Sequence, residues 1–212
     1  MTRLRIQRLV VIGVGLIGGS LARALRAAGA VEEVVGCGRG RANLERALEL
    51  GVVDHWTQDP GTAVEGADMV LLAVPLGAMA ATMTAMRERL EPKAILTDAG
   101  SAKGSVVEDA RRVFGALPGN FVPGHPIAGT ERSGVEASFE ELFQNRRVIL
   151  TPLPETDPAA TARVADMWRC CGAQVSFMDV QHHDEVLAAT SHLPHMLAYG
   201  LVDSLSRLQA ND

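Results

Sequence analysis

The chain has 212 residues and is 47% hydrophobic, which is enough to bury a full core. Its net charge is -5 and its 20 basic residues are scattered, so we expect neither a nucleic-acid surface nor an anionic-membrane surface. Three cysteines and a short apolar run at the N-terminus exclude a disulfide framework and a signal peptide, and together these features predict a cytoplasmic globular protein that binds a small molecule.

Short runs rich in Val, Ile and Leu alternate with segments of helical periodicity in residues 1–178. The predicted strands are RLVVIGVG, EEVVGCG, ADMVLLAVP, KAILTDAG, RRVILTP and AQVSFM. The predicted helices include Ile17–Ala28, Ala42–Leu50 and Leu76–Leu90. This alternation predicts an α/β fold, a Rossmann-type, doubly wound, mostly parallel sheet with helices on both faces.

A G-x-G-x-x-G motif follows the first predicted strand and opens the first predicted helix. In this position the helix N-terminus binds a dinucleotide pyrophosphate, and residues 1–178 are therefore predicted to be a dinucleotide-binding domain. The alternative is a tight turn from strand to helix with no ligand. The expected cofactor contacts are Gly13, Gly15, Leu16, Ile17 and Gly18.

The end of the second predicted strand indicates which nicotinamide cofactor binds. A carboxylate there would bind the ribose hydroxyls of NAD, but the run from Cys37 to Arg41 has none. Arg39 and Arg41 could instead bind a 2'-phosphate through paired hydrogen bonds. NADP is therefore favoured and NAD is possible. The alternative is that both arginines cap an exposed turn, or that Arg39 stacks on adenine.

Two further loops follow predicted strands, where ligands bind in open parallel sheets. Val74 and Pro75 are expected to line the ribose side of the cofactor, although Pro75 is equally typical of an ordinary strand end. Ser101 stands at the end of TDAG, two residues before Lys103, where a helix is expected to begin. Its hydroxyl has two possible roles, in the chemistry or as a cap of that helix.

His125 lies in the segment FVPGHPIAGTERSG, which is typical of neither helix nor strand. Pro123 and Pro126 restrict the backbone, while Gly124 and Gly129 permit sharp turns. The segment therefore predicts a rigid turn that presents an imidazole. Such a histidine is either a catalytic base or an ordinary hydrogen-bonding residue.

Residues 179–212 contain no strand signal and predict one long helix from Asp179 to Leu208, with Asp179 as its N-cap and Pro194 as a kink. Ser191 and His195 are four residues apart and share a helix face. No carboxylate or cysteine completes a metal-binding set with the histidines, so no metal site is predicted. Apolar residues spread around more of the helix than one packed face requires, which predicts a partner surface.

Five segments in this order resemble the prephenate and arogenate dehydrogenases of tyrosine biosynthesis. They are VIGVGLIGGSLA, LLAVP, TDAGSAKGSV, GHPIAGTERSG and ATSHLPHMLA. The resemblance implies an NAD(P)-dependent oxidative decarboxylation of prephenate to 4-hydroxyphenylpyruvate or of arogenate to tyrosine. It also implies that residues 179–212 begin an all-helical domain for dimerisation and substrate binding, and that the protein is a homodimer.

The resemblance also implies roles for single residues. His125 would accept the hydrogen bond of the substrate's ring hydroxyl and take its proton as hydride leaves for the nicotinamide. Ser101 would orient His125, and Thr130 and Glu131 would shape the substrate pocket. Ser191 and His195 would reach the substrate's side chain from the helical region.

Members of that family continue beyond the point that matches Asp212, with more helices and a substrate-binding arginine. We therefore expect the chain as given to be truncated and to bind prephenate poorly. One competing hypothesis is a hydroxyacid or 6-phosphogluconate-type dehydrogenase, but residues 179–212 lack the lysine base that it requires. Another is a dinucleotide-sensing module without catalysis.

Overall fold

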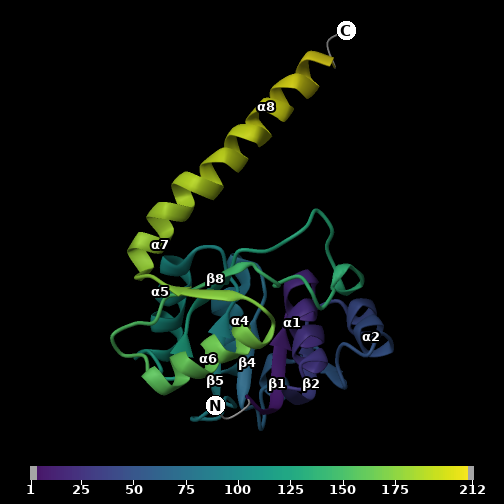
Figure 1. Cartoon of the computed structure of the whole chain (residues 1–212), viewed down its shortest axis with the longest axis vertical. Coiled ribbons are helices and arrows are strands. Elements are labelled where there is room, and N and C mark those ends of the chain that lie inside the picture. Colours follow the sequence, from purple (N-terminus) through teal and green to yellow (C-terminus); the bar gives the residue numbers. More distant parts are fainter. Residues whose placement is uncertain (1–3, 210–212) are drawn as a thin grey trace.

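A six-stranded parallel sheet forms the centre of the structure, a computed structural model in which residues 4–209 are described (Figure 1). Its strand order is β3-β2-β1-β4-β5-β6, and all neighbouring pairs are parallel. The order reverses between β1 and β4, which leaves a crevice at the carboxyl ends of these strands. The predicted doubly wound fold is confirmed. The strands are β1 (Ile6–Ile12), β2 (Val31–Cys37), β3 (His55–Thr57), β4 (Met69–Leu72), β5 (Ile95–Asp98) and β6 (Phe121–Val122).

Helices bury both faces of this sheet, as the near-continuous apolar strands require. In β1, Leu9 and Val11 pack into one buried cluster, while Val10 and Ile12 pack into the other. The first cluster is covered by α1 (Leu16–Ala27), α2 (Arg41–Glu49) and α6 (Pro158–Cys170). The second is covered by α3 (Pro60–Ala63), α4 (Met79–Met86) and α5 (Lys103–Phe114).

A separate three-stranded sheet corrects two of the predictions. Its strands are β7 (Gly124–Pro126), β8 (Arg147–Leu150) and β9 (Gln174–Phe177), with β7 antiparallel and β9 parallel to β8. The runs RRVILTP and AQVSFM therefore do not extend the main sheet. His125 lies in a strand opposite Ile149, not in a turn. Pro126 is tolerated because β7 is an edge strand, where a missing N–H breaks no central ladder.

The predicted C-terminal helix is present, but it is divided into three parts. They are α7 (Val180–Leu187), a π-helical turn η3 (Ala188–His192) and α8 (Leu193–Gln209). Asp179 is the N-cap as predicted, since its carboxylate accepts from the His182 N–H at 2.8 Å. The π turn lies just before Pro194, whose ring clashes with a carbonyl in a regular α-helix.

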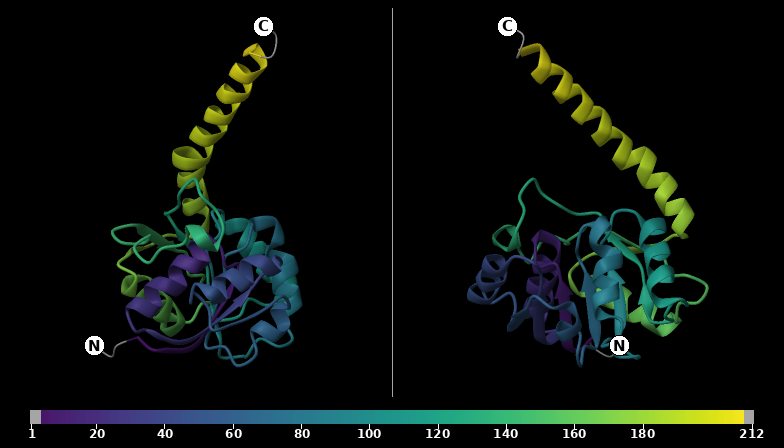
Figure 2. Two further views of the ribbon diagram at one scale, coloured as in Figure 1. Left: turned by 90° about the vertical axis from the view of Figure 1, so that its right-hand side faces the viewer. Right: turned by 180° about the vertical axis from the view of Figure 1, so that it is seen from behind.

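α7 and α8 have different surroundings. α7 packs against α5, with His183 and Leu187 buried, whereas α8 projects from the body of the molecule in every view (Figures 1 and 2). The two short 3-10 segments are η1 (Leu76–Ala78) and η2 (Val135–Ala137). In the part of the chain that is described, no helix is both long and apolar enough to cross a membrane.

Candidate active site

The glycine motif forms the turn between β1 and α1. Gly13 has a φ of 102°, and a Cβ there would stand 2.2 Å from the carbonyl oxygen of Ala73 at the end of β4. A Cβ on Gly18 would stand 2.4 Å from the carbonyl oxygen of Gly13. Gly15, in contrast, has no atom within 4 Å of its Cβ position, so this side of the turn is open. No side chain caps α1 here, and its first N–H groups remain available to an anion.

A cavity of about 390 Å³ lies above this turn, at the point where the strand order reverses. Its lining combines the glycine loop, the end of β2, and the residues that follow β4. The predicted cofactor residues in the lining are Gly13, Gly15, Arg39, Val74 and Pro75. Leu16, Ile17 and Gly18 belong to α1 just behind the loop. The position and size of the cavity are those of a nucleotide site.

Arg39 and Arg41 have different surroundings. Arg39 lines the cavity, and its carbonyl accepts from the Gln58 side chain at 2.6 Å. Arg41 is outside the lining, donates to the Glu45 carboxylate at 2.8 Å, and lies 5.8 Å above the Trp56 ring. Of the two arginines predicted to reach a 2'-phosphate, the structure therefore places only Arg39 at the cavity.

Asn43 connects the cavity to the segment after β7, a role that no local sequence pattern indicates. Its amide nitrogen donates to the carbonyl of Val14 at 2.7 Å. Its amide oxygen accepts from the N–H of Val135 at 3.0 Å. One side chain thus ties the glycine loop to the segment that follows Thr130 and Glu131.

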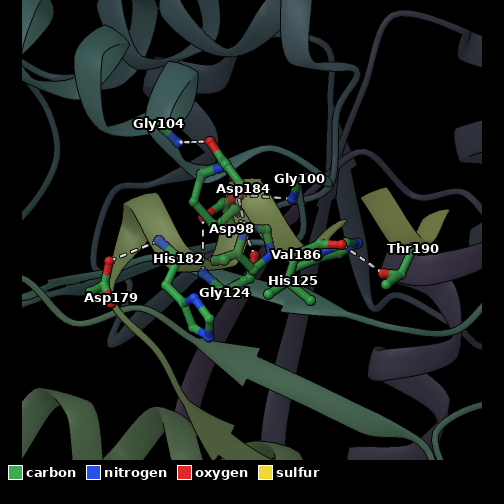
Figure 3. Close-up of polar contacts among 12 residues, drawn as sticks. Asp98, Gly100, Gly104, Gly124, His125, Asp179, His182, Asp184, Val186 and Thr190 are labelled. Carbon is green, nitrogen blue, oxygen red and sulfur yellow. Dashed lines mark hydrogen bonds and ion pairs between the residues drawn. The ribbon is translucent and has the colours of Figure 1, made fainter. Parts of the chain in front are cut away.

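His125 lies on β7 with only 9% of its surface exposed. Its Nδ1 is 2.9 Å from Nε2 of His183, and Nδ1 of His183 is 2.7 Å from the Asp184 carboxylate. His183 is fully buried, and both partners come from α7. Figure 3 shows His125 and Asp184 close together where α7 crosses the strand.

A buried ion pair supports the backbone next to His125. Lys103 and Asp98 are both fully buried and form a salt bridge, and the lysine also donates to the carbonyl of Gly124 at 2.6 Å. Asp98 accepts from the N–H groups of Gly100 at 2.7 Å and of Gly124 at 3.1 Å. Because both backbone groups of Gly124 are held, β7 is fixed relative to the end of β5.

The surroundings of His125 keep its imidazole neutral. Burial lowers the pKa of His125 to about 3, and the positive charge of Lys103 acts in the same direction, followed by His183 and His192. Asp184 opposes this shift. Burial also lowers the pKa of His183 despite its bond to Asp184. At neutral pH both rings are therefore uncharged and can accept as well as donate hydrogen bonds.

Ser101 does not have either of its predicted structural contacts. It is exposed, and α5 begins after Ala102 with no side-chain cap from its own N-cap residue. The N–H groups of Lys103 and Gly104 are instead bound by the Asp184 carboxylate, each at 2.8 Å. The alternative that Ser101 caps α5 is wrong. The hydrogen bond that orients His125 comes from His183 and not from Ser101.

The other predicted substrate residues lie at one end of the molecule, and all are exposed except Ser191, which is half-buried. Thr130 and Glu131 belong to the segment between β7 and η2, which rises from the end of the domain where α8 departs (Figure 2). Ser191 lies in the π turn and His195 in the first turn of α8, and the His195 Nδ1 is 2.7 Å from the Ser191 carbonyl oxygen. The structure brings none of these four side chains into hydrogen-bond contact with His125.

Four residues of the site were not predicted from the sequence, namely Asp98, Lys103, His183 and Asp184. Two of them, Lys103 and His183, nevertheless lie at positions where helical spacing indicates a buried side chain. Lys103 precedes the buried Val106, Val107 and Ala110 at helical spacing, which indicates a lysine that faces inward. His183 is four residues before the buried Leu187. Across residues 4–209, no group of three or more His, Cys, Asp or Glu side chains could hold a metal ion.

A doubly wound sheet with an open glycine loop beside a cavity indicates a dinucleotide-dependent enzyme of Rossmann type, and a buried neutral histidine lies in the same domain. Two family models match the chain. The prephenate dehydrogenase nucleotide-binding domain matches residues 21–177, and the prephenate dehydrogenase dimerization domain matches residues 179–212. The chain belongs to the prephenate dehydrogenase family, and it is an enzyme.

Individual relatives agree with this assignment. The cyclohexadienyl dehydrogenase of Zymomonas mobilis is 42% identical over 201 residues, which cover 94% of this chain and 68% of that protein. The structure of prephenate dehydrogenase from A. aeolicus in complex with hydroxyphenyl propionate and NAD+ has a TM-score of 0.89 at 36% identity, covering 96% of this chain and 71% of that one. Arogenate dehydrogenase from Synechocystis has a TM-score of 0.82 at 32% identity, covering 93% and 69%.

Proposed function

We propose that this protein catalyses the NAD(P)-dependent oxidative decarboxylation of prephenate to 4-hydroxyphenylpyruvate, of arogenate to tyrosine, or of both. Family membership and the relatives named above support this reaction. Loss of hydride and carbon dioxide makes an aromatic ring, so the driving force lies in the substrate. The enzyme must position the ring, provide a proton acceptor and hold the substrate's charges.

The residues of the glycine loop fit a nicotinamide dinucleotide. The space beside Gly15 is open, the first N–H groups of α1 have no side-chain cap, and the cavity continues to Val74 and Pro75. A bound dinucleotide supplies the hydride acceptor. We assign its pyrophosphate to the loop from Gly13 to Gly18, where the helix dipole favours negative charge.

His125 is assigned as the proton acceptor, and its buried neutral imidazole is the observation on which the proposed function depends. Its Nδ1 is engaged by His183, while its Nε2 has no hydrogen-bond partner among residues 4–209. A low pKa keeps the imidazole neutral at neutral pH, so one of its two ring nitrogens carries a lone pair. The free nitrogen accepts the hydrogen bond of the substrate's ring hydroxyl, and the proton moves to it as hydride leaves.

The remaining assignments are proposals for the substrate-bound enzyme. Thr130 and Glu131 shape the pocket from the segment that rises beside β7, and Ser101, after the end of β5, takes part in the chemistry with His125. Ser191 and His195 bind the substrate's side chain once α8 has packed against a second subunit. On this view residues 1–178 bind the dinucleotide and residues 179–212 begin a helical domain for dimerisation.

The cofactor assignment favours NADP over NAD. The end of β2 carries no carboxylate from Cys37 to Arg41, and Arg39 lines the cavity there. A guanidinium at this position binds a 2'-phosphate through charge-assisted hydrogen bonds. NAD remains a substrate of the same site, because the glycine loop contacts only the part common to both cofactors.

Turnover measurements test the proposed function directly. The full-length protein is purified and mixed with prephenate or arogenate, each with NAD or NADP, and formation of reduced dinucleotide is followed by absorbance. We expect reduction with at least one substrate and a lower KM for NADP than for NAD. Dinucleotide binding without reduction for either substrate would contradict the proposal and favour a sensing module.

A further inference from the structure

The side chains of His125, His183 and Asp184 form a continuous hydrogen-bonded series that runs from β7 into α7. The His125 Nδ1 to His183 Nε2 distance is 2.9 Å, and the His183 Nδ1 to Asp184 Oδ1 distance is 2.7 Å. The middle ring is fully buried and the carboxylate is about one-third exposed. The assignment of His125 as proton acceptor does not itself require either residue of α7.

The charge state of the Asp184 carboxylate determines which ring nitrogens of His183 and His125 carry a hydrogen. Partial burial raises the pKa of Asp184. Hydrogen bonds from the N–H groups of Lys103 and Gly104 and from His183 lower it by more, so the net shift of this pKa is downward. Asp184 is therefore ionised at neutral pH and can only accept hydrogen bonds. Nδ1 of His183 must then carry a hydrogen.

The same reasoning extends to His125. A neutral His183 with its hydrogen on Nδ1 has a lone pair on Nε2, so it accepts from Nδ1–H of His125. The single hydrogen of a neutral His125 is thereby placed on Nδ1. Its Nε2 keeps a lone pair, which is the atom that a proton acceptor needs.

We propose that His183 and Asp184 are positioning residues that hold His125 in the Nδ1–H tautomer and so make its Nε2 the proton acceptor. The proposal rests on the proposed function, because it explains how His125 is prepared for that reaction. Neither residue needs to touch the substrate. They act through the ring of His125, as an orienting carboxylate does for the histidine of a hydrolase triad.

The position of Asp184 is itself fixed by α5. Its two carboxylate oxygens accept from the first N–H groups of that helix, at Lys103 and Gly104, each at 2.8 Å. A Cβ on residue 104 would stand 2.9 Å from the carboxylate, so glycine permits this close approach. Lys103 then reaches the carbonyl of Gly124 beside His125. Strand β7 and helices α5 and α7 are thus held at one point (Figure 3).

The tautomer can be measured without any substrate. In the whole protein labelled with 15N in histidine, NMR correlation spectra distinguish a protonated ring nitrogen from an unprotonated one. We expect His125, assigned by the loss of its signals in His125→Asn, to show a protonated Nδ1 and an unprotonated Nε2 at neutral pH. A protonated Nε2 would overturn the proposal. Because this readout requires no turnover, it is independent of the proposed reaction.

Substitution of His183 tests the functional consequence. His183→Leu removes the acceptor, so we expect the Nε2–H tautomer to appear and kcat with prephenate to fall at least about tenfold, with little change in KM. His183→Gln offers a carbonyl oxygen to Nδ1–H and should restore part of the rate. His182→Leu is the matched control, because His182 is exposed on the same helix.

The outcomes separate a positioning role from a purely structural one. If His183→Leu folds, binds dinucleotide and keeps the wild-type tautomer and kcat, the proposal is wrong. If His183→Leu does not fold, the tautomer of His125 in the wild type and in His183→Gln decides between a positioning role and a purely structural one. A protonated Nε2 in the wild type would rule out the positioning role. If the wild-type tautomer is as expected but prephenate and arogenate are not turned over, the proposed function fails and the tautomer assignment stands.

Discussion

At the scale of single residues, the main result is the environment of His125. An exposed histidine has a pKa of roughly 6.5, and nothing in the sequence around His125 indicates a lower value. Burial first, then the charge of Lys103 and the rings of His183 and His192, lower the pKa of His125 to about 3. The imidazole is therefore neutral throughout the physiological range, which suits a hydrogen-bond acceptor.

This low pKa predicts that the protein loses stability in acid. Below about pH 6.5 the unfolded chain binds a proton at residue 125 that the native protein does not bind, so the free energy of unfolding falls as the pH drops toward 3. By about pH 5 the loss from this group is about 2 kcal/mol. The lowered pKa of His183 adds to the loss in the same direction.

Urea unfolding of wild type and His125→Gln at about pH 7.5 and pH 5 measures this effect. The decrease in the free energy of unfolding between the two pH values should be about 2 kcal/mol smaller in the variant. Both proteins keep the other titratable groups around this position, so the pH dependence that comes from these groups is common to both. They are Lys103, His183, His192 and Asp184. An equal decrease in both proteins would show that His125 is not held neutral in the native state.

Arg39 provides a second prediction at this scale. Arg39→Ala should weaken NADP binding by about 1.5 to 3 kcal/mol and leave NAD binding almost unchanged, because one charge-assisted interaction with the 2'-phosphate is lost. Arg41→Ala is the matched control, since Arg41 is already paired with Glu45 and lies outside the cavity. Isothermal titrations of wild type and the two variants with both dinucleotides give the six affinities to compare. Equal losses for NAD and NADP in Arg39→Ala would mean that Arg39 does not select the cofactor.

The sequence predicted the residues that carry a local signature, and it missed those whose role depends on tertiary contacts. The glycine motif and its strand could be identified because spacing and context are local. His183 could not be assigned, because its partner His125 is 58 positions earlier and no local pattern links them. Ser101 showed the opposite error, since a serine just before a helix is a common cap, but here a carboxylate from α7 takes that position.

At the scale of elements, the two glycines Gly18 and Gly15 in the turn between β1 and α1 have different roles. Gly18 is required for packing, and Gly15 is expected to be required for dinucleotide binding. Gly18→Ala should destabilise the protein by about 1 to 3 kcal/mol, because its methyl group would meet the Gly13 carbonyl and the Val11 side chain. Gly15→Ala should keep the wild-type Tm, because its methyl group meets no protein atom. It should nevertheless weaken NAD and NADP at least about tenfold, because the methyl group occupies the space of the pyrophosphate.

Thermal melts and dinucleotide titrations of the two glycine variants test this separation. The expected pattern is a lower Tm for Gly18→Ala and a lower affinity at unchanged Tm for Gly15→Ala. Unchanged affinity in Gly15→Ala would mean that the dinucleotide does not approach this loop.

The elements of the main sheet were predictable, and the small sheet was not. Apolar runs such as Val10–Ile12 and Met69–Leu72 are buried on both faces, so composition alone marks them as strands. β7 contains a glycine, a histidine and a proline, and it is a strand only because β8 pairs with it. The long C-terminal helix was predicted from its periodicity, but the π turn before Pro194 depends on backbone geometry that periodicity does not describe.

At the scale of the whole molecule, the projecting helix α8 predicts self-association. Its large apolar side chains are 53% to 67% exposed. They are Leu193, Met196, Leu197, Tyr199, Leu201, Val202, Leu205 and Leu208. Packing this surface against a second copy of the chain would remove it from water, so we expect the protein to dimerise. The match of residues 179–212 to a dimerization domain supports this expectation.

Sedimentation velocity over a range of concentrations tests the association. Wild type should sediment as a dimer or larger species, and the double variant Leu197→Glu, Leu201→Glu should sediment as a monomer that still binds dinucleotide. Ser206→Glu adds a charge to the same helix without removing an apolar side chain and is the control. A wild-type monomer at every concentration would contradict the prediction.

The most direct test of the central claim is the kcat of His125→Asn with prephenate. If His125 is the proton acceptor, kcat should fall by about two to four decades, while the fold and dinucleotide affinity are retained. His182→Asn, a change at an exposed histidine of α7, should keep the wild-type rate. A decrease of less than about tenfold in His125→Asn would remove His125 from the mechanism and contradict the account.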